Sequence, residues 1–498
     1  MKYVIGVDLG TSAVKTLLIA QDGAVKAEAT REYPLFHEKS GWSEQEPEDW
    51  VTGTIGALQE LTAQAGVKPQ DIEGMSFSGQ MHGLVLLDQA GKPVRRAMLW
   101  NDTRTTEQCR EIERALGDKL LSVTRNPALE GFTLPKILWV KQHEPETFAR
   151  AKQFLLPKDY LRLRLTGASH MDLSDAAGTL MLDVAGKRWS EDVLSAFGLP
   201  ASFCPPLVEA SGLVGTLSPE AAAATGLLEA TKVFAGGADN ACGAIGAGIL
   251  SPGVTLCSIG TSGVVLTYEA DASADYAGKV HFFNHGKPDA FYAMGVTLAA
   301  GYSLSWFRNT FAKGESYEQL LDGVDAIPAG SGGLLFTPYL VGERTPHPDA
   351  VIRGSFVGMD GSHTRTHFAR AVMEGITFSL NESIDLFRAA GKTVDTIVSI
   401  GGGAKNPVWL QMQADVFQAN VVALENEQGP GLGAAMLAAV GCGWFASLDA
   451  CGEVFVKRAR TYVPNPDTSE AYGKLFRIYQ QVYAQTRELN ASLKAFRN

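Results

Sequence analysis

The chain has 498 residues, more than one hydrophobic core usually serves, so its length predicts two domains. Hydrophobic residues make up 45% and charged residues 19%, the balance of a globular protein, and the net charge of −11 argues against a broad nucleic-acid surface. No run of eighteen apolar residues suggests a membrane span. The six cysteines form no CxxC pair. We therefore expect a cytoplasmic enzyme with no nucleic-acid partner, no membrane segment, no disulfide framework and no zinc site.

The first part of the chain alternates β-branched apolar runs with short turns. Gln21-Asp22-Gly23 connects the second run to the third, which gives a meander. Pro47 and Glu48 suit the first turn of a helix. The expected elements, in chain order, are strands over 2–7, 14–19 and 24–30, a helix over 47–64 and a strand over 72–77.

The second part of the chain repeats this order. Gly10-Thr11-Ser12 follows the first strand, and Gly260-Thr261-Ser262 interrupts an apolar run in the same way. The later elements are a strand over 264–268, a helix over 364–387, a strand over 396–400 and a helix over 407–418. One short repeat and a similar order predict a duplicated fold, with one copy in each half.

A segment rich in glycine and alanine, residues 232–253, separates the two copies. Small residues permit close backbone approach and hinge motion, so we place the domain boundary there. We predict a first domain over 1–245 and a second over 246–465. The last segment, 466–498, contains an amphipathic helix over 469–493 that we expect to pack back on the first domain.

The paired Gly-Thr-Ser turns predict phosphate binding. Glycine allows a tight reversal whose N–H groups point at an anion, and the hydroxyls add donors, so we assign Gly10, Thr11 and Ser12, with Gly260 and Thr261, to a polyphosphate. Either turn alone would be interpreted as an ordinary hairpin. Asp8 occurs beside the first turn only, where a carboxylate would repel phosphate unless Mg²⁺ intervened, and Lys15 could supply compensating charge.

Two glycine-rich segments, each leading into a helix, suggest further binding or catalytic residues. Gly402 and Gly403 end a strand ahead of a helix and would let an adenine-ribose group lie on bare backbone. Asp239 follows Gly-Gly-Ala and opens a small-residue helix, where it is either an N-cap or a general base in the interdomain cleft. Asn240 beside it could orient the hydroxyls of an alcohol substrate.

Two loops in the first domain are candidates for sugar binding. Met81 and His82 follow a strand in a glycine-flanked loop, from which the histidine could donate to a polyol hydroxyl. Trp100 and Asn101 open a segment, 100–104, that combines an aromatic face with amides. That segment fits a sugar-binding loop and a capped helix start equally well.

Two long spaced patterns resemble the signatures of the FGGY family of carbohydrate kinases, within the actin, hexokinase and heat-shock ATPase superfamily. The first is GFTLPKILWVKQH, residues 131–143; the second is GSFVGM, residues 354–359, followed after seven residues by HFARAVME, residues 367–374. Further segments, among them 78–83, 155–167, 172–184 and 338–347, resemble members that act on D-xylulose.

The resemblance implies an α/β fold of two actin-like (ribonuclease H-like) domains, with mixed sheets flanked by helices and the active site in the cleft between them. It implies transfer of the ATP γ-phosphoryl group to the 5-hydroxyl of D-xylulose, with Mg²⁺, in a protein that could form a homodimer. By the same resemblance Asp239 accepts the proton and Asp8 acts near the metal. Met81 and His82 contact the sugar, and Asn406 joins the nucleoside site.

The alternatives are another ketose or polyol as substrate, such as a ribulose or a fuculose, and, from a different class, a non-catalytic sugar sensor or an ATPase chaperone.

Overall fold

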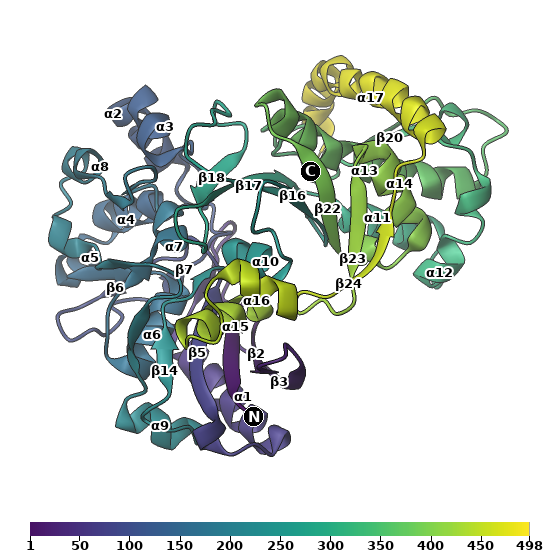
Figure 1. Ribbon diagram of the computed structural model, residues 1–498. Coiled ribbons are helices and arrows are strands. Elements are labelled where there is room, and N and C mark those ends of the chain that lie inside the picture. Colours follow the sequence, from purple (N-terminus) through teal and green to yellow (C-terminus); the bar gives the residue numbers. More distant parts are fainter. Residues whose placement is uncertain (498) are drawn as a thin grey trace.

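A computed structural model describes residues 1–497 of the protein and consists of two lobes, each built on a mixed β-sheet flanked by helices (Figure 1). None of the described helices combines the length and the apolar character needed to cross a membrane. The architecture confirms the predicted fold class of two α/β domains. Its strands and helices matter here mainly because they carry the turns predicted to bind the ligands.

The sheet of the first lobe has the strand order β13-β14-β5-β1-β2-β3, and β15 pairs with β5. Neighbouring strands β1, β2 and β3 are antiparallel, whereas β5 runs parallel to both β1 and β14. The strand bounds are β1 Tyr3–Leu9, β2 Ala13–Ala20, β3 Val25–Glu32, β5 Ile72–Gly79, β13 Leu213–Thr216, β14 Lys232–Phe234 and β15 Gly237–Ala238.

The sheet of the second lobe has the order β18-β19-β17-β16-β22-β23-β24. Here β16 pairs antiparallel with β17, β17 antiparallel with β19, and β16 parallel with β22, which in turn runs parallel to β23. The bounds are β16 Gly253–Ile259, β17 Gly263–Glu269, β18 His281–Asn284, β19 Phe291–Thr297, β22 Val394–Gly401, β23 Asn420–Leu424 and β24 Arg458–Tyr462.

The two sheets therefore share one plan, and the duplication predicted from the Gly-Thr-Ser repeat is confirmed. In each lobe an antiparallel hairpin closed by that turn leads to a third antiparallel strand, and a helix then crosses to a parallel strand beside the first. The crossover helices are α1 (Pro47–Ala65) and α13 (Arg365–Ala389). Because the hairpins are equivalent, both turns come to the same edge of their sheets.

The helical segment between β5 and β13 forms a cap on the first lobe (Figure 1). Its helices are α2 Thr106–Leu116, α3 Asp118–Thr124, α4 Thr133–His143, α5 Pro145–Arg150, α6 Pro157–Thr166, α7 Leu173–Ala177 and α8 Glu191–Ala196, and α9 Pro219–Thr225 follows β13. In the second lobe the remaining helices beside the sheet include α11 Gly301–Phe311, α12 Tyr317–Leu320 and α14 Pro407–Phe417.

The last helix, α17 (Pro466–Leu493), packs on the second lobe, so the expectation that it returns to the first was wrong. The reason is its buried aromatic face. The Tyr472 hydroxyl donates to Glu374 Oε1 at 2.8 Å and accepts from Arg370 Nη2 at 2.9 Å, both on α13. The Tyr479 ring lies 5.4 Å from that of Phe378 on the same helix. An amphipathic pattern predicts burial of such a face but not its partner.

A different segment returns to the first lobe. Helices α15 (Pro430–Gly441) and α16 (Leu448–Phe455) leave the second sheet, and α15 packs on β1, β5 and α10 (Asp239–Gly246) before β24 rejoins the second lobe (Figure 1). The segment 246–465 is thus divided between the lobes. A side chain at Gly433 would lie 1.9 Å from the Cys242 carbonyl oxygen, so α10 and α15 cross with their backbones nearly in contact.

Candidate active site

The two Gly-Thr-Ser turns are held by their carbonyl groups. In the first turn, between β1 and β2, the Tyr33 hydroxyl donates to the Gly10 carbonyl, and Gln45 Nε2 donates to the Thr11 carbonyl at 2.6 Å. Gln45 is itself fixed, because its Oε1 accepts from Trp50 Nε1 at 3.0 Å. In a trans peptide the N–H points opposite to the preceding C=O. Inward carbonyls therefore turn the N–H groups of residues 11 and 12 outward.

The second turn reaches the same result by other means. Backbone N–H groups at the start of α11 hold its carbonyls, with Gly301 donating to Gly260 at 2.8 Å and Tyr302 donating to Thr261 at 3.0 Å. A side chain at Gly301 would lie 2.4 Å from the Gly260 oxygen, so this contact requires glycine. Both turns thus present donors for an anion. The sequence predicts the turns but not the residues that orient them.

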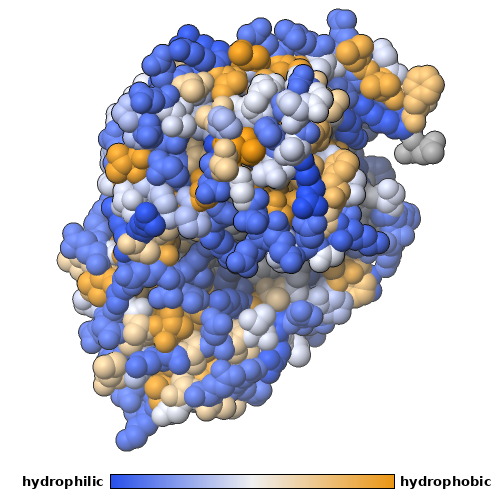
Figure 2. All heavy atoms as spheres, turned by 90° about the vertical axis from the view of Figure 1, so that its right-hand side faces the viewer, coloured by the Kyte–Doolittle hydropathy of each residue, from blue (hydrophilic) through white to orange (hydrophobic). Residues whose placement is uncertain are grey.

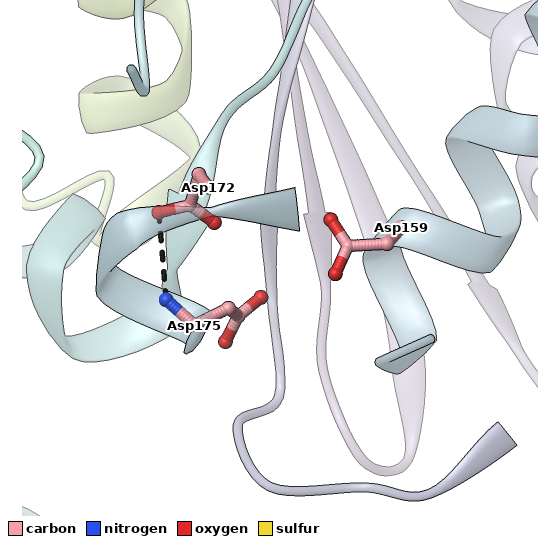
Figure 3. Close-up of side chains that lie close together, drawn as sticks. All are labelled: Asp159, Asp172 and Asp175. Carbon is pink, nitrogen blue, oxygen red and sulfur yellow. Dashed lines mark hydrogen bonds between the residues drawn. The ribbon is translucent and has the colours of Figure 1, made fainter. Parts of the chain in front are cut away.

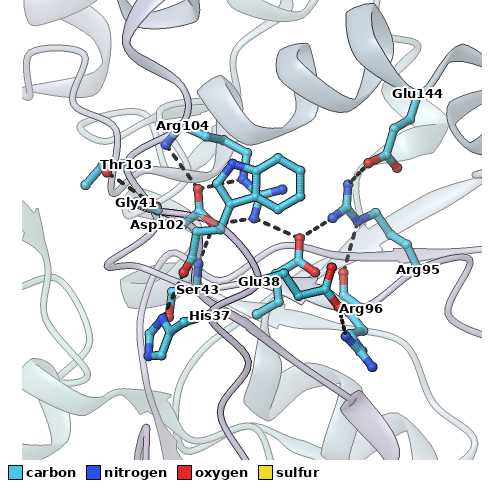
Figure 4. A network of polar contacts seen from close by, with 12 residues as sticks. His37, Glu38, Gly41, Ser43, Arg95, Arg96, Asp102, Thr103, Arg104 and Glu144 are labelled. Carbon is cyan, nitrogen blue, oxygen red and sulfur yellow. Dashed lines mark hydrogen bonds and ion pairs between the residues drawn. The ribbon is translucent and has the colours of Figure 1, made fainter.

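Trp100 lies against the first turn, where its indole N–H donates to Thr11 Oγ1 at 2.9 Å. Its loop is anchored from behind by a network around Asp102 and Arg104 (Figure 4). Helix α2 begins at Thr106 with Thr105 as N-cap, so the helix-start interpretation of the loop was wrong. The buried side-chain oxygen of Asn101 finds no hydrogen-bond partner among residues 1–497. Contact of this loop with a sugar stays a prediction.

Asp8 lies near the end of β1, opposite Lys15 on β2 and Ser78 on β5. Burial raises the pKa of its carboxyl group, although the Ser78 hydroxyl and the Lys15 ammonium act in the other direction. Lys15 Nζ lies 3.0 Å from a carboxylate oxygen of Glu28 and donates to Gln428 Oε1 at 3.0 Å. Lys15 thus lies on the strand beside Asp8 but is paired with Glu28, and its role in compensating phosphate charge stays a prediction.

Asp239 is the first residue of α10, and Ala238 is its N-cap, which decides against the capping role for Asp239. Burial, together with the charge of Asp8, raises the pKa of the Asp239 carboxyl group to about 7. Its Oδ1 accepts from the Asn240 backbone N–H at 2.7 Å and from the Asn240 side chain at 3.2 Å. A carboxyl group with this pKa can accept and release a proton near neutral pH.

Met81 lies close to Asn240, the neighbour of Asp239, and His82 is the next residue in the chain. Asn240 Nδ2 is 3.5 Å from the Met81 sulfur. Burial lowers the pKa of His82 to about 3, so the ring is neutral, and its Nδ1 lies 2.7 Å from the Gly178 carbonyl oxygen. A neutral ring facing a carbonyl must donate from Nδ1, which leaves Nε2 unprotonated. The backbone contact thus fixes the tautomer of the ring, and the contact of His82 with a sugar hydroxyl stays a prediction.

The backbone of His82 has a left-handed conformation, with φ of 65°, that residues other than glycine seldom adopt. Its carbonyl accepts from Lys136 Nζ and from Thr133 Oγ1, both at 3.1 Å. Lys136 is fully buried and donates also to the carbonyls of Gly131 and Phe132. Burial lowers its pKa to about 7, although Asp102 acts in the other direction. Sequence analysis placed Lys136 in a family signature without giving it this contact.

Aromatic residues of the second lobe approach the same place. The rings of Phe132 and Phe283 lie 4.6 Å and 6.0 Å from that of His82, and Phe283 belongs to β18 of the second lobe. The Tyr292 hydroxyl lies 3.9 Å from the Met81 sulfur. Met81 and His82 thus lie where the lobes meet. Phe283 and Tyr292 belong to ordinary apolar strand runs, which carry no sequence signal for such a role.

A cavity of about 760 Å³ lies in the second lobe. It gathers all five residues predicted there for nucleotide binding, namely Gly260, Thr261, Gly402, Gly403 and Asn406, together with Tyr302, Tyr317 and Trp409, which were not predicted. The Asn406 side-chain oxygen caps α14 by accepting from Val408 N at 2.9 Å. The surface is hollowed between the upper and lower parts of the molecule and is largely polar there (Figure 2).

Two turns that present backbone donors and a buried carboxylate with a raised pKa, carried by two lobes of the same plan, fit an enzyme of the sugar-kinase class. Comparison with known proteins agrees. Residues 3–246 match the N-terminal domain and residues 255–442 the C-terminal domain of the FGGY family of carbohydrate kinases. The chain belongs to this family.

Similar proteins of known sequence and structure include a xylulose kinase of Bacillus subtilis, 63% identical over the full length of both chains. A solved xyloylose kinase from Brucella ovis is 35% identical, covers 98% of this chain and 100% of its own, and has a TM-score of 0.92. A gluconate kinase from Lactobacillus acidophilus is 29% identical over 100% of both chains, with a TM-score of 0.93. The fold is therefore shared by relatives named for different sugars.

Proposed function

We propose that the protein phosphorylates D-xylulose, transferring the γ-phosphoryl group of ATP to the 5-hydroxyl to give D-xylulose 5-phosphate and ADP. The observation that carries the chemistry is Asp239, a buried carboxyl group whose pKa is raised to about 7, beside Asn240 and Met81. The choice of sugar is supported by the 63% identity to the Bacillus subtilis xylulose kinase.

In the proposed reaction Asp239 accepts the proton of the attacking hydroxyl. The sugar oxygen forms a bond to the γ-phosphorus while the bond from that phosphorus to the bridging oxygen breaks, and ADP takes the electron pair. Outward N–H groups at Thr11 and Thr261 would hold the phosphate oxygens from the two lobes. His82 Nε2 would accept from a second sugar hydroxyl and so orient the ketose.

The nucleoside of ATP is assigned to the cavity of the second lobe. Gly402 and Gly403 would lie against one face of the base or ribose, and the aromatic rings of Tyr302 and Trp409 line the same cavity. The size of the cavity, about 760 Å³, suits a nucleoside with part of its phosphate chain.

The residues around Asp8 fit a divalent cation such as Mg²⁺. Asp8 raises the pKa of Asp239, so the two carboxylates are close enough to repel each other. They lie beside the turns that we propose to bind phosphate. Hard oxygen ligands of this kind suit Mg²⁺, which would supply positive charge to the triphosphate when bound. Asp8 is the residue that we expect to hold it.

The test is a panel of ketoses and polyols, including D-xylulose, ribuloses and fuculoses, followed through ADP release. We expect the highest kcat/KM with D-xylulose. Asp239→Asn should lower kcat by at least about 10²-fold while ATP still binds, because the variant cannot accept the proton. A higher kcat/KM on another sugar would overturn the substrate assignment. Full turnover by Asp239→Asn would overturn the assigned base.

A further inference from the structure

A buried cluster of charged residues lies beneath the segment that leads into Asp239. Asp159 belongs to α6, while Asp172 and Asp175 come from the short strand Met171–Asp172 and helix α7 (Figure 3). All three side chains are fully buried, and one carboxylate oxygen from each lies within 4.8 Å of the others. Carboxylates this close need a cation among them or a proton on one of them.

That cation is the ammonium group of Lys158, which is also fully buried. Its Nζ lies 2.7 Å from Asp159 Oδ1, 2.6 Å from Asp172 Oδ1 and 2.8 Å from Asp175 Oδ2. Burial disfavours the charge of Lys158, but the three carboxylates outweigh burial and raise its pKa. The Lys158 ammonium group thus occupies the position that a metal ion bound by the three carboxylates would take. We call Lys158, Asp159, Asp172 and Asp175 together the internal anchor.

Residues bonded to the anchor form hydrogen bonds with both ends of the segment before Asp239, residues 235–238. The Ser174 hydroxyl donates to Asp172 Oδ2 and accepts from the backbone N–H of Ala238 at 2.9 Å. At the other end Arg162, paired with Asp159 at 3.1 Å, donates from Nη1 to the Ala235 carbonyl at 2.6 Å.

Between these two points lie Gly236 and Gly237, which have no side chains to fix them. Gly236 has a φ of 81°, and a side chain there would lie 2.1 Å from the Phe77 carbonyl oxygen. The segment therefore lies directly against β5. Its two glycines have high backbone freedom, so they do not by themselves fix the conformation of the segment. A general base must stay within hydrogen-bond reach of its hydroxyl, and a displacement near 1 Å can cost about 10²-fold in rate.

We propose that Ser174 is a positioning residue for Asp239: held by Asp172, which pairs with Lys158, its hydroxyl fixes the Ala238 amide and thereby the direction of the adjacent carboxylate. The inference rests on the proposed base role of Asp239. Ser174 acts through the backbone of the neighbouring residue.

The test compares Ser174→Ala with wild type at saturating ATP and D-xylulose. We expect kcat to fall about tenfold or more. The KM for ATP and the rate of ATP hydrolysis in the absence of sugar should stay within about twofold of wild type. The pH midpoint of kcat/KM should move below its wild-type value, because a loosened carboxylate is better hydrated. Ser174→Cys, which keeps the shape but accepts hydrogen bonds weakly, should give an intermediate kcat and midpoint.

Ser190→Ala is the matched control. Ser190 is a buried serine of the same lobe, and its hydroxyl accepts from Val193 N at 3.3 Å to cap α8. Its loss should lower Tm comparably and leave kcat and the pH midpoint unchanged. Wild-type kcat in Ser174→Ala, or in Ser174→Cys should the alanine variant not fold, overturns the inference. So does a fall in kcat with an unmoved midpoint. Asp239→Asn, assayed in parallel, tests the base role separately.

Discussion

At the scale of single residues, the chemistry of the site depends on charges that burial has displaced from their ordinary behaviour. Asp239 has a pKa of about 7 because burial and Asp8 both disfavour its anion. Lys136 and His82 have lowered pKa values because burial disfavours their cations. Asp239 is held by its neighbour Asn240, whereas His82 and Lys136 also have partners that are distant in sequence.

The pH dependence of the reaction should follow Asp239. Only the unprotonated carboxylate accepts a proton, so kcat/KM for the ketose should fall as pH drops below about 7, approaching about tenfold per unit. Initial rates from pH 5 to 9 with a pH-insensitive ADP assay measure this. A kcat/KM that stays level down to pH 5 would contradict the assignment of Asp239 as the titrating base.

The same carboxylate should cost stability at alkaline pH. Between the ordinary value of 3.8 and about 7 the folded state holds the Asp239 proton more tightly than the unfolded chain, so this group lowers the free energy of unfolding as pH rises through that window. Asp239→Asn removes the charge. We expect its Tm to exceed that of wild type at pH 8, with the difference shrinking toward pH 4. An equal difference at both pH values would contradict this.

Lys136 should matter for the sugar and not for the nucleotide. Lys136→Met keeps the length of the side chain but removes the donor to the His82 carbonyl, so the left-handed backbone of His82 loses a support. We expect the KM for D-xylulose to rise about tenfold while ADP release without sugar is unchanged. Lys141→Met is the control, because Lys141 lies on the same helix but donates to the Phe197 carbonyl. Equal losses in both variants would refute this role.

At the scale of elements, the two Gly-Thr-Ser turns have the same orientation of their peptide groups, but different contacts hold it. Side chains of Tyr33 and Gln45 hold the carbonyls of the first turn, whereas the backbone at the start of α11 holds those of the second. A turn sequence by itself does not decide which way its peptide groups face. The surrounding elements decide it.

Gly301→Ala tests the second turn. Alanine favours a helix over glycine, but its Cβ would lie 2.4 Å from the Gly260 oxygen, so the turn must move. We expect the KM for ATP to rise about tenfold or more and the KM for the ketose to change little. Gly361→Ala is the control, because no atom of the described chain lies within 4 Å of a side chain added there. An unchanged KM for ATP would show that the turn does not bind phosphate.

At the scale of the whole molecule, the cavity proposed for the nucleotide and the first turn belong to different lobes. Gly260 and Thr261 line that cavity, whereas Gly10, Thr11 and Ser12 are absent from its lining in the described chain. We therefore expect the lobes to approach each other when one triphosphate contacts both turns. The crossing of α10 and α15, where backbones nearly touch, is the natural place for the pivot.

Small-angle scattering should detect this closure. We expect the radius of gyration to decrease when D-xylulose and a non-hydrolysable ATP analogue are bound together, because closure excludes water from the phosphoryl group. The ATP analogue alone serves as the control for ligand mass. An unchanged radius with both ligands would contradict a closing cleft.

The sequence by itself determined the elements and much of the local chemistry. Apolar periodicity located the main strands and helices, with α1 at Pro47–Ala65 against a predicted 47–64 and α14 at Pro407–Phe417 against 407–418. The repeated turn predicted the duplication, and five residues assigned to the nucleotide came together in one cavity. These features are legible because spacing along the chain fixes which residues share a face or a turn.

Only the tertiary structure decided which surfaces meet. The aromatic face of α17 could have covered either lobe, and the match of Tyr472 to Arg370 and Glu374 chose the second. Likewise α15 returned to the first lobe, and Ser174 met Ala238 across 64 positions of sequence. Such contacts depend on complementary shape and on the pairing of buried polar groups between distant segments, which no local pattern encodes.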